Sequence, residues 1–178
     1  KERVPSTFEH GIGGLDFLKR TGSYYHYGYG LYSAGHAQLD LIKAADEETM
    51  VHGRNREDTM ILGDSGGFQV AKGIIKLDWT NAKDPNDPAR LALCQKILTW
   101  LESTSDWSMT LDIPGFACDG TLGEKTGLKN FQETLDISIL NLDYFIKNRT
   151  PGKTKFLNVI SGGSVENGRL WYDGVKKY

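Results

Sequence analysis

The chain has 178 residues, a formal net charge of −2, and 39% hydrophobic and 25% charged residues. This length can bury a substantial core, and the composition excludes a disordered or fibrous protein. No apolar run approaches the ~20 residues of a membrane-spanning helix, so we expect no membrane partner and a cytoplasmic location. The slight negative charge gives no indication of the basic face common in nucleic-acid-binding proteins.

The two cysteines, Cys94 and Cys118, are too few for a disulfide framework and fit a reducing compartment. Cys94 falls in an apolar helical pattern and is expected in the core. Cys118 falls in a loop, where it would be a free thiol. Neither has a partner at metal-ligand spacing, so we expect no metal site within the chain.

Residues 1–32 are rich in glycine and tyrosine and predict irregular structure. Within them, Gly11–Gly14 follows no apolar strand and indicates a turn rather than a phosphate-binding loop. The tyrosines of residues 24–29 are expected to pack against the domain more readily than to stack on bases. Ser33 then suits the N-cap of a helix over residues 34–50.

Residues 59–62 are β-branched or apolar and predict a buried strand whose carboxyl end carries Asp64. A polar excursion over residues 71–87 follows, and Asp87 with Pro88 is a good helix start. The pattern then predicts, in order, a helix over 88–103, a strand over 107–112, a helix over 128–147, a strand over 154–160 and a helix from about 166 to the end.

Alternating helices and strands predict an α/β fold with a parallel sheet and right-handed crossovers. The three predicted strands end in Asp64, in Asp112 and in Ser161-Gly162-Gly163. Polar groups gathered at strand carboxyl ends are typical of a (β/α)8 TIM-type barrel, which usually needs ~250 residues. We therefore expect a single partial barrel domain over residues 1–178, with four or five of the eight units. A smaller open sheet is the alternative.

The most informative stretch is Asp64-Ser65-Gly66-Gly67-Phe68-Gln69-Val70. Two glycines after a strand-end carboxylate allow positive φ and let a ligand approach the backbone closely. Phe68 adds a flat apolar face beside the acid. A carboxylate, a bare backbone and an aromatic ring together suit a nucleobase, whereas the simpler interpretation is a turn in which Asp64 caps the next helix.

This stretch resembles the signature of the tRNA-guanine transglycosylases of the queuine and archaeosine type, a superfamily with a DNA-modifying branch. These enzymes exchange guanine for a 7-deazaguanine. The resemblance implies that Asp112 reads the guanine edge and that Asp64 handles protons and positioning at the reacting centre. It also implies substrate-binding or supporting roles for further residues: Ser65, Phe68, Gln69, Ser161, Gly162 and Gly163.

The sequence departs from the family pattern in three places. Ser161 stands where the family usually has Gln before the glycine pair, and Ile113–Gly115 replace the acid and cysteine common in bacterial members. In the family, the nucleophilic Asp and a Cys/His zinc cluster lie further along than residue 178, so the chain is expected to be truncated relative to it. No cofactor is expected here, and a structural zinc only if a C-terminal segment follows.

The reaction that the resemblance implies is base exchange at the ribosyl or deoxyribosyl C1′ of tRNA or DNA, through a covalent sugar–enzyme intermediate, with the target base flipped out. The chain could instead be a non-catalytic barrel subunit or scaffold of such an enzyme, which leaves a homodimer or a partner subunit open. A glycoside hydrolase that uses Asp64 and Asp112 as its acid and base is a further alternative.

Overall fold

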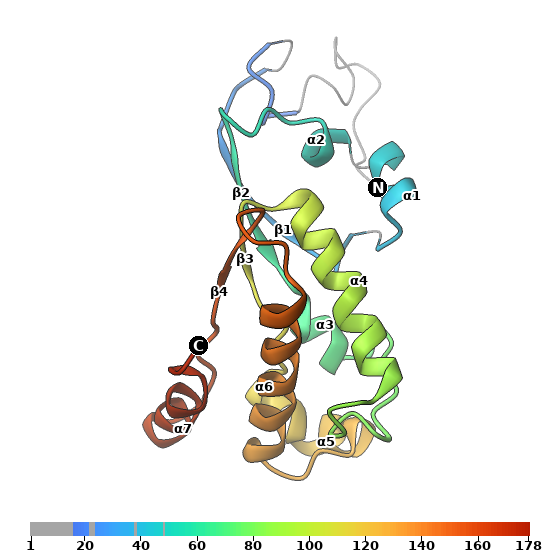
Figure 1. The fold of residues 1–178 in the computed structure, drawn as a ribbon, viewed down its shortest axis with the longest axis vertical. Helices are drawn as coiled ribbons and strands as arrows, with labels where there is room; N and C mark the ends of the chain where they lie inside the picture. The colour runs from blue at the N-terminus through green and yellow to red at the C-terminus, as the bar shows by residue number, and fades with distance from the viewer. Residues whose placement is uncertain (1–15, 22–23, 38, 48) are drawn as a thin grey trace.

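The computed structural model describes residues 16–21, 24–37, 39–47 and 49–178 (Figure 1). Four parallel strands form one sheet in the order β1-β2-β3-β4. They are β1 (Tyr29–Ser33), β2 (Met60–Asp64), β3 (Trp107–Met109) and β4 (Lys155–Leu157). The helices are α1 (Leu41–Glu47), α2 (Thr49–His52), α3 (Gly67–Ala71), α4 (Pro88–Thr104), η2 (Gly115–Cys118), α5 (Gly120–Thr126), α6 (Phe131–Asn148) and α7 (Val165–Val175). The predicted α/β class with a parallel sheet is confirmed.

The long helices begin where the sequence supplies a capping side chain. Asp87 accepts a hydrogen bond from the Arg90 backbone N–H at 2.8 Å, directly before Pro88 at the first position of α4. Asn130 caps α6 and Ser164 caps α7 in the same way. Each cap satisfies a backbone donor that has no partner inside the helix. The predicted helices over 88–103 and 128–147 are therefore confirmed to within a few residues.

The amino-terminal predictions were partly wrong. Residues 29–33 form β1 instead of irregular structure, and Ser33 ends that strand rather than capping a helix. The helix predicted over 34–50 starts only at Leu41, because the Ala34 N–H donates to the Asp64 carbonyl and extends the β1–β2 pairing. Gly11–Gly14 lie outside the described residues.

Three further elements differ from the sequence prediction. The short helices α3, η2 and α5 fall in stretches that were expected to be loops. The strands predicted over 107–112 and 154–160 are confirmed in place, but each is only three residues long.

Some side chains were predicted from the sequence as well. Tyr24, Tyr25, Tyr27 and Tyr29 were expected to pack against the domain, but they are 48–59% exposed. Cys94 is buried in α4 as expected, and Cys118 is a partly exposed free thiol.

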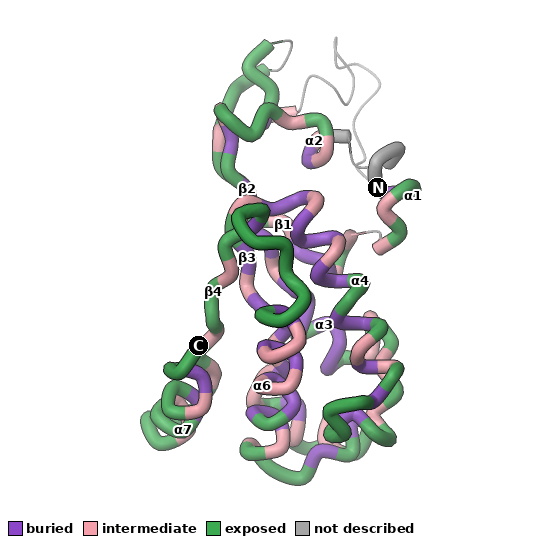
Figure 2. Tube along the Cα trace, viewed as in Figure 1, coloured by how far each residue is buried: buried purple, intermediate pink, exposed green. Residues whose placement is uncertain are grey.

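The core lies between the sheet and the helices on one of its faces. Figure 1 shows α4 and α6 side by side across this face, with α7 beyond β4, and Figure 2 shows buried residues concentrated along α4 and α6. Tyr32 of β1 meets Trp100 of α4 with ring centroids 5.1 Å apart. Phe156 of β4 meets Phe145 of α6 edge-to-face at 5.5 Å. These ring contacts fix the helix layer on the sheet.

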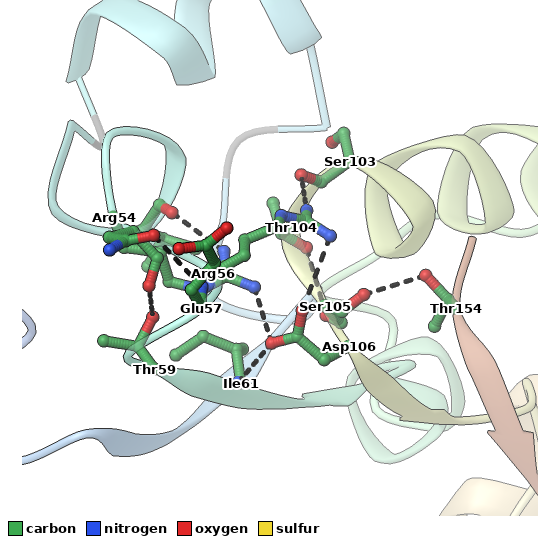
Figure 3. Close-up of polar contacts among 12 residues, drawn as sticks. Arg54, Arg56, Glu57, Thr59, Ile61, Ser103, Thr104, Ser105, Asp106 and Thr154 are labelled. Atoms are coloured by element: carbon green, nitrogen blue, oxygen red, sulfur yellow. Dashed lines mark hydrogen bonds and ion pairs between the residues drawn. The ribbon is translucent and has the colours of Figure 1, made fainter. Parts of the chain in front are cut away.

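A polar cluster fastens the strands where they begin (Figure 3). One carboxylate oxygen of Asp106, just before β3, accepts from Arg54 Nη2 and from the Ile61 backbone N–H of β2, each at 2.8 Å. The Arg54 side chain is only 1% exposed, and Arg56 donates to the Ser103 carbonyl. Since one carboxylate joins β2 to β3, this cluster sets the register that aligns their opposite ends.

Among the residues that the structure describes, no helix is long and apolar enough to cross a membrane.

Candidate functional site

Asp64 occupies the carboxyl end of β2 and is held there by β1. Its Oδ2 accepts a 2.6 Å hydrogen bond from the Ser33 hydroxyl, and its carbonyl accepts from the Ala34 N–H at 2.8 Å. The Ser33 hydroxyl in turn accepts from the Gly35 N–H at 3.1 Å. This chain of bonds fixes one carboxylate oxygen of Asp64 and leaves the carboxylate only partly buried.

The glycine pair after Asp64 brings the tips of β2 and β3 into contact. Gly66 has φ of 78°, a conformation that glycine adopts without strain, and it turns the chain into α3. A Cβ on Gly67 would overlap the carbonyl oxygen of Asp112 and would lie 3.6 Å from its Oδ1. Only a residue without a side chain allows this approach. The glycine pair therefore brings Asp64 and Asp112 together at one edge of the sheet.

Burial raises the pKa of Asp112 to about 6 from its ordinary value of 3.8. A hydrogen bond to its own backbone opposes this shift, and the nearby negative charge of Asp64 adds to it. Two carboxylates that repel each other in a partly dehydrated setting favour a ligand that brings hydrogen-bond donors. A perturbed acid at a strand end is also a common mark of a functional site.

Phe68 projects from the first turn of α3 and is 50% exposed. Its ring meets Phe116 of η2 edge-to-face, with centroids 5.7 Å apart, and the Lys72 ammonium lies 5.5 Å from its centroid. The exposed half of the ring is a surface on which a flat ligand can stack.

A cavity of about 500 Å³ is lined by Phe116, whose ring also contacts Phe68. It opens to solvent between η2, the start of α6, the loop after β4 and the start of α7. Its lining residues are Gly115, Phe116, Cys118, Asp119, Lys129, Asn130, Phe131, Ser161, Gly162, Gly163 and Asn167. Neither Asp64, Asp112 nor Phe68 lines it; Asp112 instead borders a much smaller gap beside Asn158 and Trp171. The site thus has two parts. One is the acidic edge, by which we mean Asp64 and Asp112 at the strand ends, and the other is the cavity. Phe116 links the two parts, because it lines the cavity and contacts Phe68.

The loop after β4 is held against η2. The Ser161 hydroxyl accepts from the Gly115 N–H at 3.2 Å. Gly162 has φ of 154° and packs so closely on α7 that a Cβ would lie 2.6 Å from the Gly168 nitrogen, whereas Gly163 is open. These contacts use the Ser161 side chain to position the loop and leave the glycine backbone at the cavity wall.

Ser65 and Gln69 lie beneath the surface rather than facing a ligand. Ser65 is fully buried and donates to the Thr110 carbonyl at 3.0 Å, which ties β2 to the end of β3. Gln69 is 8% exposed, and its Nε2 lies 3.2 Å from His36 Nε2. The Ser65 bond joins the ends of β2 and β3, and the Gln69 contact joins α3 to the loop after β1.

Sequence reasoning missed Ser33 and Phe116. Ser33 was assigned to a helix cap because the glycine- and tyrosine-rich stretch before it hid β1. Phe116 was passed over because η2 has no periodic pattern. The regular spacing of apolar residues at 29 and 31, opposite 60 and 62, is the signal that could have revealed β1 and hence the Ser33–Asp64 pair.

Within the described part of the chain, no group of three or more His, Cys, Asp or Glu side chains could hold a metal ion. Comparisons with protein-family models, with curated proteins and with solved structures found no match to this chain.

Proposed function

We propose that this chain is the base-binding part of a guanine transglycosylase, which exchanges guanine for a 7-deazaguanine in tRNA or DNA. The observation that carries the proposal is the contact between two strand ends, in which Gly67 lies against Asp112 and brings Asp64 and Asp112 to one edge. The finer architecture that we propose is a (β/α)8 barrel, of which this chain supplies four strands, in a cytoplasmic protein.

Asp112 is the residue that reads the base. Guanine offers two adjacent donors, N1–H and the 2-amino group, and one ionised carboxylate can accept from both. Hydrogen bonds to an ionised group are about twice as strong as neutral ones. Because burial disfavours the charge of Asp112, two donors from the base would stabilise its ionised form. A 7-deazaguanine carries the same edge, so one pocket serves the leaving and the entering base.

The neighbouring groups complete the recognition. In this proposal the exposed face of Phe68 stacks on the purine. The backbone at Gly162 and Gly163, which line the neighbouring cavity beside Phe116, is assigned to donate to the O6 oxygen. Asp64, whose carboxylate is held by Ser33, is assigned to position the base for proton transfer. A cavity of about 500 Å³ leaves room for more than the base.

The exchange proceeds in two displacements at C1′. An enzyme carboxylate attacks C1′ while the bond to N9 of guanine breaks, and its electron pair leaves with the base, which takes up a proton. The deazaguanine then loses its N9 proton and displaces the carboxylate, so the configuration at C1′ is retained. We assign base recognition to Asp112 and positioning to Asp64. The attacking carboxylate comes from a residue other than those to which the resemblance assigns a role in this chain.

Binding of a 7-deazaguanine to purified protein tests the proposal, by calorimetry or fluorescence. Asp112→Ala should abolish binding. Phe68→Ala should weaken it about tenfold or more, since base–aromatic stacking contributes ~1–3 kcal/mol. Ile74→Ala is the matched control, because Ile74 is 65% exposed near α3 but outside the site. If the unaltered chain binds no base, the scaffold alternative replaces our proposal. If the unaltered chain does bind a base, exchange of labelled guanine into tRNA or duplex DNA identifies the polynucleotide.

A further inference from the structure

The buried side of α6 carries polar side chains among its apolar ones. Thr134, Ser138 and Asn141 are 0%, 5% and 1% exposed, respectively. A polar group removed from water costs free energy unless it finds a hydrogen-bond partner inside the protein. Thr134 donates to the Phe131 carbonyl of its own helix at 2.7 Å, whereas Ser138 and Asn141 also bond to backbone outside α6. The last two side chains therefore support another segment of the chain.

The partners of these two side chains lie on either side of Asp112. Asn141 Nδ2 donates to the Leu111 carbonyl at 3.1 Å, and the Ser138 hydroxyl oxygen accepts from the Ile113 N–H at 2.8 Å. Residues three apart on a helix lie on the same face. One face of α6 thus holds the residue before Asp112 and the residue after it.

Further hydrogen bonds fix the orientation of both side chains. Asn141 Oδ1 accepts from Arg90 Nη1 at 3.1 Å, and Arg90 is 1% exposed. Because a guanidinium can only donate, the amide oxygen of Asn141 faces Arg90 and its NH2 group faces Leu111. The Ser138 hydroxyl donates to the Thr134 carbonyl at 2.8 Å, so its proton is used within α6 and its oxygen accepts from the neighbouring segment.

The segment around Asp112 needs this support because the sheet does not supply it. β3 ends at Met109, and residues 110–113 belong to no strand. Buried backbone groups outside a sheet must be bonded by side chains or water. Leu111 and Ile113 are buried, whereas Asp112 between them is only partly buried. Side chains of α6 therefore take the place that backbone partners have in a strand.

We propose that Ser138 and Asn141 are positioning residues for Asp112, which hold the backbone on both sides of it and so keep its carboxylate at the partly dehydrated strand end. Their effect on base recognition rests on the proposed function, whereas the positioning itself does not. The raised pKa of Asp112 agrees with this role, since its largest cause is burial and the charge of Asp64 adds to it. Release of the segment from α6 would let water reach the carboxylate and return its pKa toward the ordinary value.

Titration of the Asp112 carboxyl group by NMR tests the proposal without any ligand. Ser138→Ala removes only the hydroxyl that accepts from Ile113, and it should lower the pKa of Asp112 from about 6 toward about 5. Thr134→Val is the matched control, because it removes a buried hydroxyl that donates within α6, and it should leave this pKa unchanged. An Asp112 pKa that is the same in all three proteins, or that falls equally in both variants, would overturn the proposal.

Hydrogen exchange in the unaltered protein gives a second test, which applies even where Ser138→Ala does not fold. The Ile113 N–H should exchange about as slowly as the amides in the middle of α6, because its partner belongs to that helix. Exchange of this N–H at the rate of exposed loop amides would contradict the positioning role.

Base binding separates this inference from the proposed function. If the unaltered chain prefers guanine to hypoxanthine, Ser138→Ala should reduce that preference to less than about threefold, while Thr134→Val retains it. A full preference in Ser138→Ala would overturn the role of Ser138 in recognition. If the unaltered chain binds neither base, the proposed function fails, and the titration still decides whether α6 positions Asp112.

Discussion

Replacing Asp112 with Asn should stabilise the protein, because the carboxylate destabilises the fold at neutral pH. Its folded pKa of about 6 lies above the ordinary value of 3.8. The folded state therefore holds the Asp112 proton more tightly than the unfolded state, and stability falls as pH rises from about 4 to about 6. The full difference corresponds to ~3 kcal/mol, an upper value because the carboxylate keeps some contact with solvent. The neutral amide keeps the shape and avoids this cost.

Urea unfolding of the two proteins at pH 4, 5, 6 and 7 measures the effect. We expect the Asn variant to gain ~1–3 kcal/mol relative to the unaltered chain between pH 4 and pH 7, or roughly 2–10 °C in Tm at pH 7. Asp136→Asn on the exposed side of α6 is the control and should show no such trend. A difference that stays flat across the pH range would refute the argument that Asp112 is desolvated beside Asp64.

Two substitutions test the framework of the site. Gly67→Ala should cost several kcal/mol of unfolding free energy, because its methyl group would overlap a backbone carbonyl, whereas Gly163→Ala, with open space around it, should be nearly neutral. Arg54→Met should cost ~3–5 kcal/mol because it leaves the partly buried Asp106 without its main partner. Lys176→Met, which breaks an exposed ion pair, should change stability by less than ~1 kcal/mol. Equal losses of unfolding free energy for the two glycine variants, or for the two methionine variants, would contradict these explanations.

The sequence was informative wherever one local signal decided the structure. Asp87-Pro88 located the start of α4, and the apolar run before Asp64 located β2. The two acids could be assigned to neighbouring strand ends because parallel strands end at the same edge. How closely the two strand ends approach each other could not be predicted, since it depends on the packing of Gly67 against the backbone of Asp112.

Other features escaped prediction because they arise from tertiary pairing. β1 is rich in glycine and tyrosine, and it is a strand only because β2 offers it a partner. The cavity depends on η2 and on the loop at Ser161, neither of which has a periodic pattern. The exposure of Leu31 and Trp107 on the sheet could not be predicted for a related reason: a strand pattern shows that a face is apolar, but not whether anything covers it.

The central claim, that the Asp112 carboxylate reads the edge of guanine, is tested most directly by comparing guanine with hypoxanthine, which lacks the 2-amino group. Equilibrium binding at pH 7.5 should be at least about tenfold tighter for guanine, because hypoxanthine leaves one side of a carboxylate unpaired. The preference should shrink as pH falls below about 6, where Asp112 becomes protonated. Equal affinity for the two bases, or a preference that does not change with pH, would contradict the account.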